Sequence, residues 1–128
     1  MSYLQFMSVE LEQLHFNGRA LHEMRIDDLR RVYWYCMRER NRSAKHRDLL
    51  VMGMSYQQWM NSIIQYIIIK YVPDELYPEW QKHKAVAAIN HCNRSNTSWY
   101  GMTLWYRLAY KDMAWWIKSF LSSKKSQI

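Results

Sequence analysis

Residues that could carry catalytic or metal chemistry are few and widely spaced. The five histidines are scattered along the chain: His15, His22, His46, His83 and His91. No Ser, Cys or carboxylate stands at a spacing that would complete a triad or an acid–base pair on one helix face. Cys36 and Cys92 lack metal-ligand spacing to another Cys or His, so we expect both thiols to be buried and reduced. These patterns predict a protein that is not an enzyme and that holds no metal or cofactor.

The remaining chemistry is the binding of anions. Lys and Arg number 18 against 11 Asp and Glu, which gives the 128 residues a net charge of +7. A surplus of this size favours a polyanionic partner, either a phosphate backbone or an anionic lipid surface. The most apolar run, 63–72, contains Gln65 and Lys70 and falls short of the roughly 20 apolar residues that a transmembrane helix needs.

Many of the arginines belong to one predicted helix, which we expect to begin at Asp27 or Asp28 as its capping residue and to end near His46. At about 100° per residue, this helix has an apolar side and an opposite cationic stripe. The apolar side comprises Ile26, Leu29, Val32, Tyr33, Cys36 and Met37, and the stripe comprises Arg31, Arg38, Arg42 and Lys45. The stripe contains no acidic residue that would pair with it inside the helix. We expect it to face phosphate, and the alternative is an ordinary solvated face.

The other elements are also predicted to be helical, so the fold class is all-α. Only three glycines and two prolines punctuate the chain, which favours a few long helices. Ser55 and Gln58 form the capping box of a second helix that Pro73 stops, with a strand through 67–69 as the alternative. Pro78 begins a third helix. The expected helices are 27–46, 55–72, 78–94 and 99–121.

Seven Trp, ten Tyr and nine Met are too many large side chains for a core of this size. Such residues are enriched at interfaces. We therefore expect one face of the last helix to pack on another protein through Trp105, Trp115, Trp116 and Phe120. The alternatives are a helix that folds back to complete a crowded aromatic core, and a helix that lies on an anionic bilayer.

The stretch DDLRRVYWYCMRERN, from Asp27 to Asn41, resembles a family signature. The stretch begins with two acidic residues and Leu, followed by a pair of arginines and Val32. Aromatic and apolar residues come next, and the stretch closes with Arg-Glu-Arg-Asn. This pattern is similar to that of the mitochondrial branch of the ribosomal protein L-twenty-nine family, called L-forty-seven in animals. Residues 17–20 resemble the Gly-Arg-Ala element upstream, and residues 82–91 resemble the returning helix of that family. Residues 43–77 and the aromatic last helix have no counterpart in the pattern.

The resemblance implies a structural constituent of the mitochondrial large ribosomal subunit, located in the matrix. It implies binding to large-subunit rRNA near the polypeptide exit tunnel and contact with neighbouring ribosomal proteins. The implied architecture is an antiparallel two-helix hairpin with an inserted helix and a C-terminal aromatic helix. Residues 1–128 then divide into an arm (1–24), the hairpin with its insertion (25–94) and an extension (95–128). The alternative is a small basic nucleic-acid-binding or membrane-associated subunit outside the ribosome.

Ten basic residues are the expected RNA contacts: Arg19, Arg30, Arg31, Arg38, Arg42, Lys45, Arg47, Lys82, Lys84 and Arg94. The guanidinium group of arginine can donate two hydrogen bonds to phosphate oxygens. Such contacts position the protein on the RNA and do not select a base sequence. Trp34 or Tyr35 could stack on an exposed base or face protein instead. Arg40 falls within the apolar side, where a buried guanidinium needs Asp27, Asp28 or an RNA phosphate as partner, unless the helix has left its packing partner by that turn.

Overall fold

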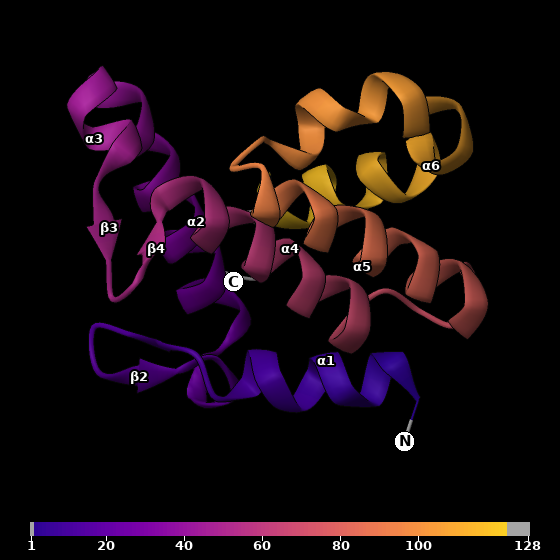
Figure 1. The fold of residues 1–128 in the computed structure, drawn as a ribbon. Helices are drawn as coiled ribbons and strands as arrows, with labels where there is room; N and C mark the ends of the chain where they lie inside the picture. The colour runs from indigo at the N-terminus through magenta and orange to yellow at the C-terminus, as the bar shows by residue number, and fades with distance from the viewer. Residues whose placement is uncertain (1, 123–128) are drawn as a thin grey trace.

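The computed structural model describes residues 2–122, and the side chains of residues 2–99 and 112–122. The described chain is mostly helical, which confirms the predicted all-α class (Figure 1). The helices are α1 (Tyr3–Glu12), η1 (Leu21–Glu23, a 3-10 turn), α2 (Ile26–Arg42), α3 (Ala44–Asp48), α4 (Tyr56–Lys70), α5 (Glu79–Arg94) and α6 (Trp99–Ser122). Two antiparallel hairpins join β1 (His15–Phe16) to β2 (Arg19–Ala20) and β3 (Leu50–Val51) to β4 (Met54–Ser55).

Helix α4 is the centre of the bundle, with α1, α2, α5 and α6 packed around it (Figure 1). Every side chain from Tyr56 to Ile68 except Gln58 is buried. A helix that is apolar on all sides belongs in a core, and this one has no charged residue before Lys70. The expected pairing of α2 with α5 as a two-helix hairpin is therefore wrong, because the inserted helix α4 lies between them and each packs mainly on it.

The polar residues of α4 are buried with hydrogen-bond partners from neighbouring elements. The Gln65 Nε2 amide donates to the Val86 carbonyl at 3.0 Å, and the Asn61 Nδ2 amide donates to the Thr97 carbonyl at 2.9 Å. An unsatisfied buried amide would cost about 1–3 kcal/mol. These bonds therefore favour one register of α4 against α5 and the loop that follows it.

Each hairpin has a two-residue turn with left-handed backbone angles. The φ angles are +51° and +82° at Asn17 and Gly18, and +52° and +84° at Met52 and Gly53. Such turns match the twist of the flanking strands. Asn17-Gly18 is a strong turn signal, whereas the hairpin around Met52 was not expected because Met is not typical of this conformation.

The helix expected over 27–46 is two helices. Asp28 accepts a hydrogen bond from the Arg25 N–H at 3.2 Å, so it caps α2 from within the first turn and not from the position before it. The chain then leaves the helical conformation at Ser43, with φ −166° and ψ +166°. The Ser43 hydroxyl accepts the His46 N–H at 3.1 Å and caps α3. Local side-chain capping of this kind competes with helix continuation, and it places Lys45 on a separate helix.

Helix α6 folds back onto the bundle, which was the alternative to an exposed aromatic face. Met113, Ile117 and Leu121 are buried, and α6 packs on α4 and α5. Trp99 and Leu121, near its two ends, line the same cavity, although a straight helix would separate them by roughly 30 Å. The helix therefore doubles back along its length, as Figure 1 shows.

Candidate nucleic-acid interface

The C-terminal ends of α2 and α5 meet at the first turn of α4. The Arg40 Nη1 group donates to Gln57 Oε1, which joins α2 to α4. The Gln58 Nε2 group donates to the Asn93 carbonyl at 2.9 Å, which joins α4 to α5. Helix α3 follows α2 directly. We call this part of the molecule the basic end and define it by Arg38, Arg40, Arg42, Lys45, Arg47 and Arg94.

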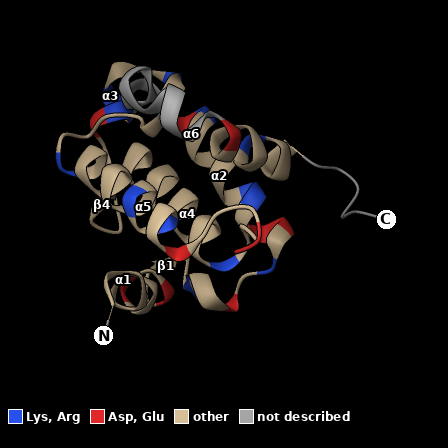
Figure 2. Ribbon diagram, turned by 90° about the vertical axis from the view of Figure 1, so that its right-hand side faces the viewer, with Lys and Arg blue, Asp and Glu red and all other residues tan. Residues whose placement is uncertain are grey.

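Positive charge is concentrated at the basic end. Its six cations have two acidic neighbours in residues 38–48, Glu39 and Asp48, which leaves a surplus of +4. The other side chains that the structure describes include eight Lys and Arg and nine Asp and Glu, which leaves −1. Helix α1, for example, carries acidic residues and no basic one (Figure 2). Among the described side chains, the surplus of positive charge therefore lies at the basic end.

The cationic stripe along α2 is exposed, but the prediction that no acidic residue pairs with it is wrong. Arg31 Nη1 lies 3.6 Å from Asp28 Oδ1, and Arg42 Nη2 lies 3.3 Å from Glu39 Oε1. Residues three positions apart on a helix are surface neighbours, so each pair forms within one turn. Arg38 is exposed and has no carboxylate partner among the described side chains. The stripe is consequently more strongly positive toward the C-terminal end of α2.

Arg30 and Lys82 were expected to contact RNA, and their burial contradicts this. Arg30 is 9% exposed, and its Nε group donates to the Phe120 carbonyl at 2.7 Å while its guanidinium lies 4.7 Å from the centre of the Phe120 ring. It also forms an ion pair with Asp27 at 3.2 Å. Lys82 is 5% exposed, and its Nζ group lies 2.6 Å from Asp74 Oδ1. Both cations are committed to contacts inside the protein.

The remaining predicted contacts are exposed but do not form one surface. Lys84 lies on the first half of α5, where its Nζ group is 5.2 Å from the centre of the Trp80 ring. Helix α4 separates this position from α2. Arg94 lies at the other end of α5, beside the start of α4, and thus joins the basic end. Arg47 and Lys45 on α3 are also exposed there.

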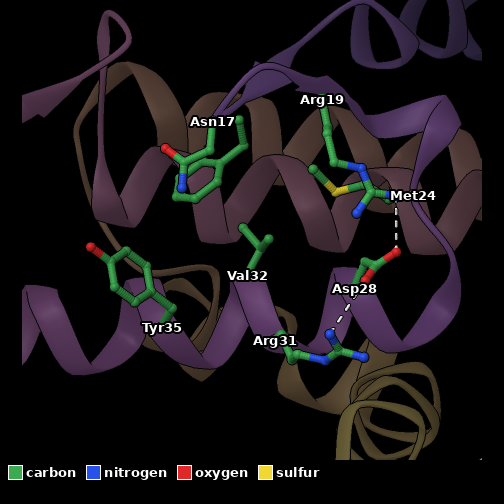
Figure 3. Close-up of a pocket in the computed structure, with 8 residues that line it drawn as sticks. Asn17, Arg19, Met24, Asp28, Arg31, Val32 and Tyr35 are labelled. Atoms are coloured by element: carbon green, nitrogen blue, oxygen red, sulfur yellow. Dashed lines mark hydrogen bonds and ion pairs between the residues drawn. The ribbon is translucent and has the colours of Figure 1, made fainter.

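Arg19 and Arg31 border a shallow cavity of about 360 Å³ between the first hairpin and α2 (Figure 3). Asp28 lies between them, with its Oδ2 atom 3.1 Å from Arg19 Nη2. The hydrogen bond from the Arg25 N–H, followed by the two arginines, lowers the pKa of Asp28, so the carboxylate stays charged at neutral pH. Apolar and aromatic side chains complete the lining: Phe16, Met24, Val32 and Tyr35.

Of the two aromatic residues considered for base stacking, the structure leaves one accessible. The Trp34 Nε1 group donates to the Leu121 carbonyl at 3.1 Å, so this indole faces protein. Tyr35 is 39% exposed, and Figure 3 shows its ring at the border of the cavity. An accessible ring beside two guanidinium groups can accept the face of a base while the arginines contact phosphate.

Three of the four residues expected at a protein interface have described side chains, and two of these pack within the chain. The Trp116 and Phe120 rings are stacked at 5.1 Å, and Phe120 lies 5.3 Å from the ring of Tyr71. Both side chains are half-buried by these contacts, so each has only part of its surface left for a partner. Trp115 is 72% exposed and stays available to one. The side chain of Trp105 lies outside the described residues.

The histidines include one arrangement that the spacing argument missed. Ser43 Oγ lies 2.9 Å from His46 Nδ1, and His46 Nε2 lies 3.9 Å from Glu39 Oε2. The sequence order Glu, Ser, His thus brings together the residue types of a triad. The Ser43 hydroxyl is occupied as the cap of α3, and the Glu39 carboxylate is shared with Arg42. Neither cavity described for this protein is lined by these residues, so we assign them to helix capping.

Both cysteines are buried and neither forms a disulfide bond, as expected. Burial, with a smaller contribution from Glu39, raises the pKa of Cys36 to about 12, and burial also raises the pKa of Cys92. A thiol of such high pKa is a poor nucleophile at neutral pH. Among the described residues, no three His, Cys, Asp or Glu side chains are grouped to hold a metal ion. Within residues 2–122, no helix has the length and apolar composition needed to cross a bilayer.

The charge distribution and the cavity of Figure 3 thus define a candidate surface for a phosphate-rich partner. Comparisons with protein-family models, with curated proteins and with solved structures find no match to this chain.

Proposed function

We propose that this chain is a non-catalytic RNA-binding protein that docks its basic end on the phosphate backbone. The observation that carries the proposal is the charge separation: +4 at the basic end against −1 over the other described side chains. A local surplus of this kind attracts phosphates and orients the approaching protein. Four of its arginines, Arg38, Arg42, Arg47 and Arg94, are exposed and can each offer several N–H donors.

The cavity between the first hairpin and α2 supports RNA over other polyanions. An unpaired base could stack on Tyr35 while Arg19 and Arg31 contact its phosphates, and single-stranded RNA presents such bases. The Asn17 side chain, which also lines the cavity, can both donate and accept hydrogen bonds at a base edge. Phosphate contacts would provide most of the affinity, and the selectivity would come from RNA shape.

The resemblance over residues 27–41 extends the proposal to a specific assembly. It implies that the RNA is the large-subunit rRNA of the mitochondrial ribosome, near the exit tunnel. The exposed Trp115 ring would then contact a neighbouring ribosomal protein. In this role the protein would position RNA and protein neighbours within the mitochondrial matrix.

Salt-dependent RNA binding tests the first part of the proposal. We would measure fluorescence anisotropy of a labelled stem–loop RNA and compare the variant R42Q/K45Q/R47Q with the control R25Q/K70Q/K84Q, whose residues lie outside both the basic end and the cavity beside Tyr35. Each variant removes three exposed positive charges and so reduces the net charge of +7 to +4. We expect the basic-end variant to reduce the slope of log K against log salt concentration by about 2, and the control to change it by less than about 1. Equal losses would contradict docking through the basic end.

Gradient sedimentation tests the specific assembly. The tagged wild-type protein should sediment with mitochondrial large subunits, and R42Q/K45Q/R47Q should shift to the top of the gradient. RNA binding without such sedimentation would place the protein on another RNA.

One observation favours a second candidate, docking on an anionic membrane. Leu49, Leu50 and Met52 are exposed beside α3, and exposed leucines next to lysine and arginine can enter a lipid headgroup layer. Flotation with vesicles that contain phosphatidylserine would distinguish the two. Flotation that is lost in L49S/L50S, together with no measurable RNA affinity, would favour the membrane.

A further inference from the structure

A second cavity lies between α2, α4 and α6 and has a volume of about 530 Å³. Its walls are largely apolar and aromatic: Tyr33, Trp34, Met37, Met60, Trp99 and Leu121. This volume lies in the range of small-molecule sites, which combine apolar walls with a few polar groups that orient the ligand. Ser98, Arg40 and Lys118 are the polar members of the lining.

The two charged residues of the described lining are both cations. Arg40 is partly buried, and its described partners are the neutral side-chain oxygens of Gln57 and Asn41. No carboxylate lies within ion-pair distance of its guanidinium among the described side chains, so Asp27 and Asp28, two of the partners considered for it, are excluded. Burial lowers the pKa of Arg40, consistent with a positive charge held away from water.

A partly buried guanidinium without a counter-ion is costly, and an anion that enters the cavity would offset this cost. Lys118 lies on the exposed side of the lining and adds a second positive charge. The two cations of the described lining thus attract an anionic group, while the walls attract an apolar body.

We propose that this cavity binds a small amphipathic carboxylic acid. The carboxylate pairs with Arg40 and Lys118, and the apolar body lies against Trp34, Met37 and Met60. An arginine fork matches the two oxygens of a carboxylate, and the aromatic and thioether walls adapt to an alkyl chain. The site is separate from the basic end's exposed cations, so the inference does not depend on RNA binding.

Calorimetric titration with decanoate tests the proposal, with decanol as an uncharged probe of nearly the same shape. We expect decanoate to bind at one site and decanol to bind at least tenfold more weakly. R40Q should weaken decanoate binding by about tenfold or more, which is the usual effect of losing one charge-assisted hydrogen bond. The matched control is R38Q, which removes a charge from the exposed face of the same helix.

A second variant and a positional readout keep the test independent of folding defects. K118E changes an exposed residue and should also weaken decanoate binding, while circular dichroism of each variant reports the fold. In protein with ¹³C-methyl methionine, decanoate should shift the Met37 and Met60 signals and leave that of Met7, buried on α1, in place. Equal affinity for decanol, unchanged binding in both R40Q and K118E, or shifts that spare Met37 and Met60 would overturn the proposal.

Discussion

Two parts of the chain are built in the same way, as a short hairpin followed by a helix. The first unit, 15–42, joins the β1–β2 hairpin to α2, and the second, 50–70, joins the β3–β4 hairpin to α4. Their turns have nearly identical φ angles, +51° and +82° against +52° and +84°. Yet α2 buries one face and exposes its arginines, whereas α4 is enclosed on nearly all sides. The same local motif thus serves as a surface in one unit and as the core in the other.

The cause of the difference is the charge of the two helices. Helix α2 has eight charged residues in its 17, and α4 has only Lys70, at its last position. Burying charge is costly unless every group is paired, so only α4 can occupy the centre. The single exception in α2 is informative, because Arg30 is buried and satisfied by contacts from α6 and its own helix. Packing position therefore follows side-chain chemistry when backbone geometry is shared.

The largest expected effect tests the core role of α4. Ile67→Ala should reduce the free energy of unfolding by about 2–5 kcal/mol, because this side chain is fully buried and the cavity left behind cannot collapse completely. Ile26→Ala, at the partly exposed start of α2, should cost clearly less. Urea unfolding followed by circular dichroism measures both. Equal costs would mean that the two helices contribute alike to the core.

A smaller loss of stability is expected for one of two neighbouring arginines of α2, and almost none for the other. Arg30→Met should cost about 1–3 kcal/mol, because it leaves the Phe120 carbonyl without its donor. Arg31→Met, at a side chain that is 76% exposed, should change stability by no more than about 0.5 kcal/mol. The same unfolding measurement applies. A larger loss for Arg31 would show that α2 is oriented differently.

Of the two units, only the first contains a carboxylate of lowered pKa, since residues 50–70 contain no Asp or Glu, and Glu12, whose pKa is lowered by Lys70, lies outside both units. The Arg25 N–H and the two neighbouring arginines lower the pKa of Asp28 below its ordinary value of 3.8. A lowered pKa in the folded state stabilises the protein above the unfolded value, and this stabilisation is lost as pH falls through the folded value. Asp28→Asn should remove about 1 kcal/mol at pH 7 and flatten the decline in stability below about pH 4. If the free energy of unfolding of Asp28→Asn declined below about pH 4 as steeply as that of the wild type, Asp28 would not be a source of the acid sensitivity.

The smallest effect makes the second turn chemically like the first. Asn adopts left-handed angles more readily than Met, so Met52→Asn should stabilise the protein by a few tenths of a kcal/mol, about 0.5 at most. The reverse change, Asn17→Met, should destabilise it by a similar amount. Thermal unfolding resolves both shifts. Destabilisation by Met52→Asn would mean that the contact between Met52 Sδ and the Asn17 N–H, at 3.3 Å, matters more than the turn.

Local signals predicted the helices well where capping or proline marks the boundary. The Ser55–Gln58 capping box and Pro73 bracket α4, and Pro78 precedes α5, as the structure confirms. The break at Ser43 was missed because serine is tolerated inside helices and its capping bond forms only once the chain turns. The β3–β4 hairpin was missed because Met-Gly carries little turn preference.

The candidate site was only partly predictable. The helical periodicity of residues 27–46 correctly predicted that Arg31, Arg38 and Arg42 are exposed, because this periodicity depends on a single element. The periodicity could not predict that Arg30 is buried while Arg31 is exposed, because the partner of Arg30 lies on α6, 90 positions along the chain. The periodicity also could not predict that Arg94 lies at the basic end, because that position depends on how α5 packs against α4.

The helical class, the excess of positive charge and the apolar character of α4 could be predicted without the structure, because they depend on composition and on contacts within a few residues. The tertiary structure decided which cations stay exposed and where they gather. It also decided that Arg40 borders a cavity whose described lining includes no carboxylate. The reason is that burial and charge pairing depend on residues distant in the chain, and their positions follow only from how the helices pack.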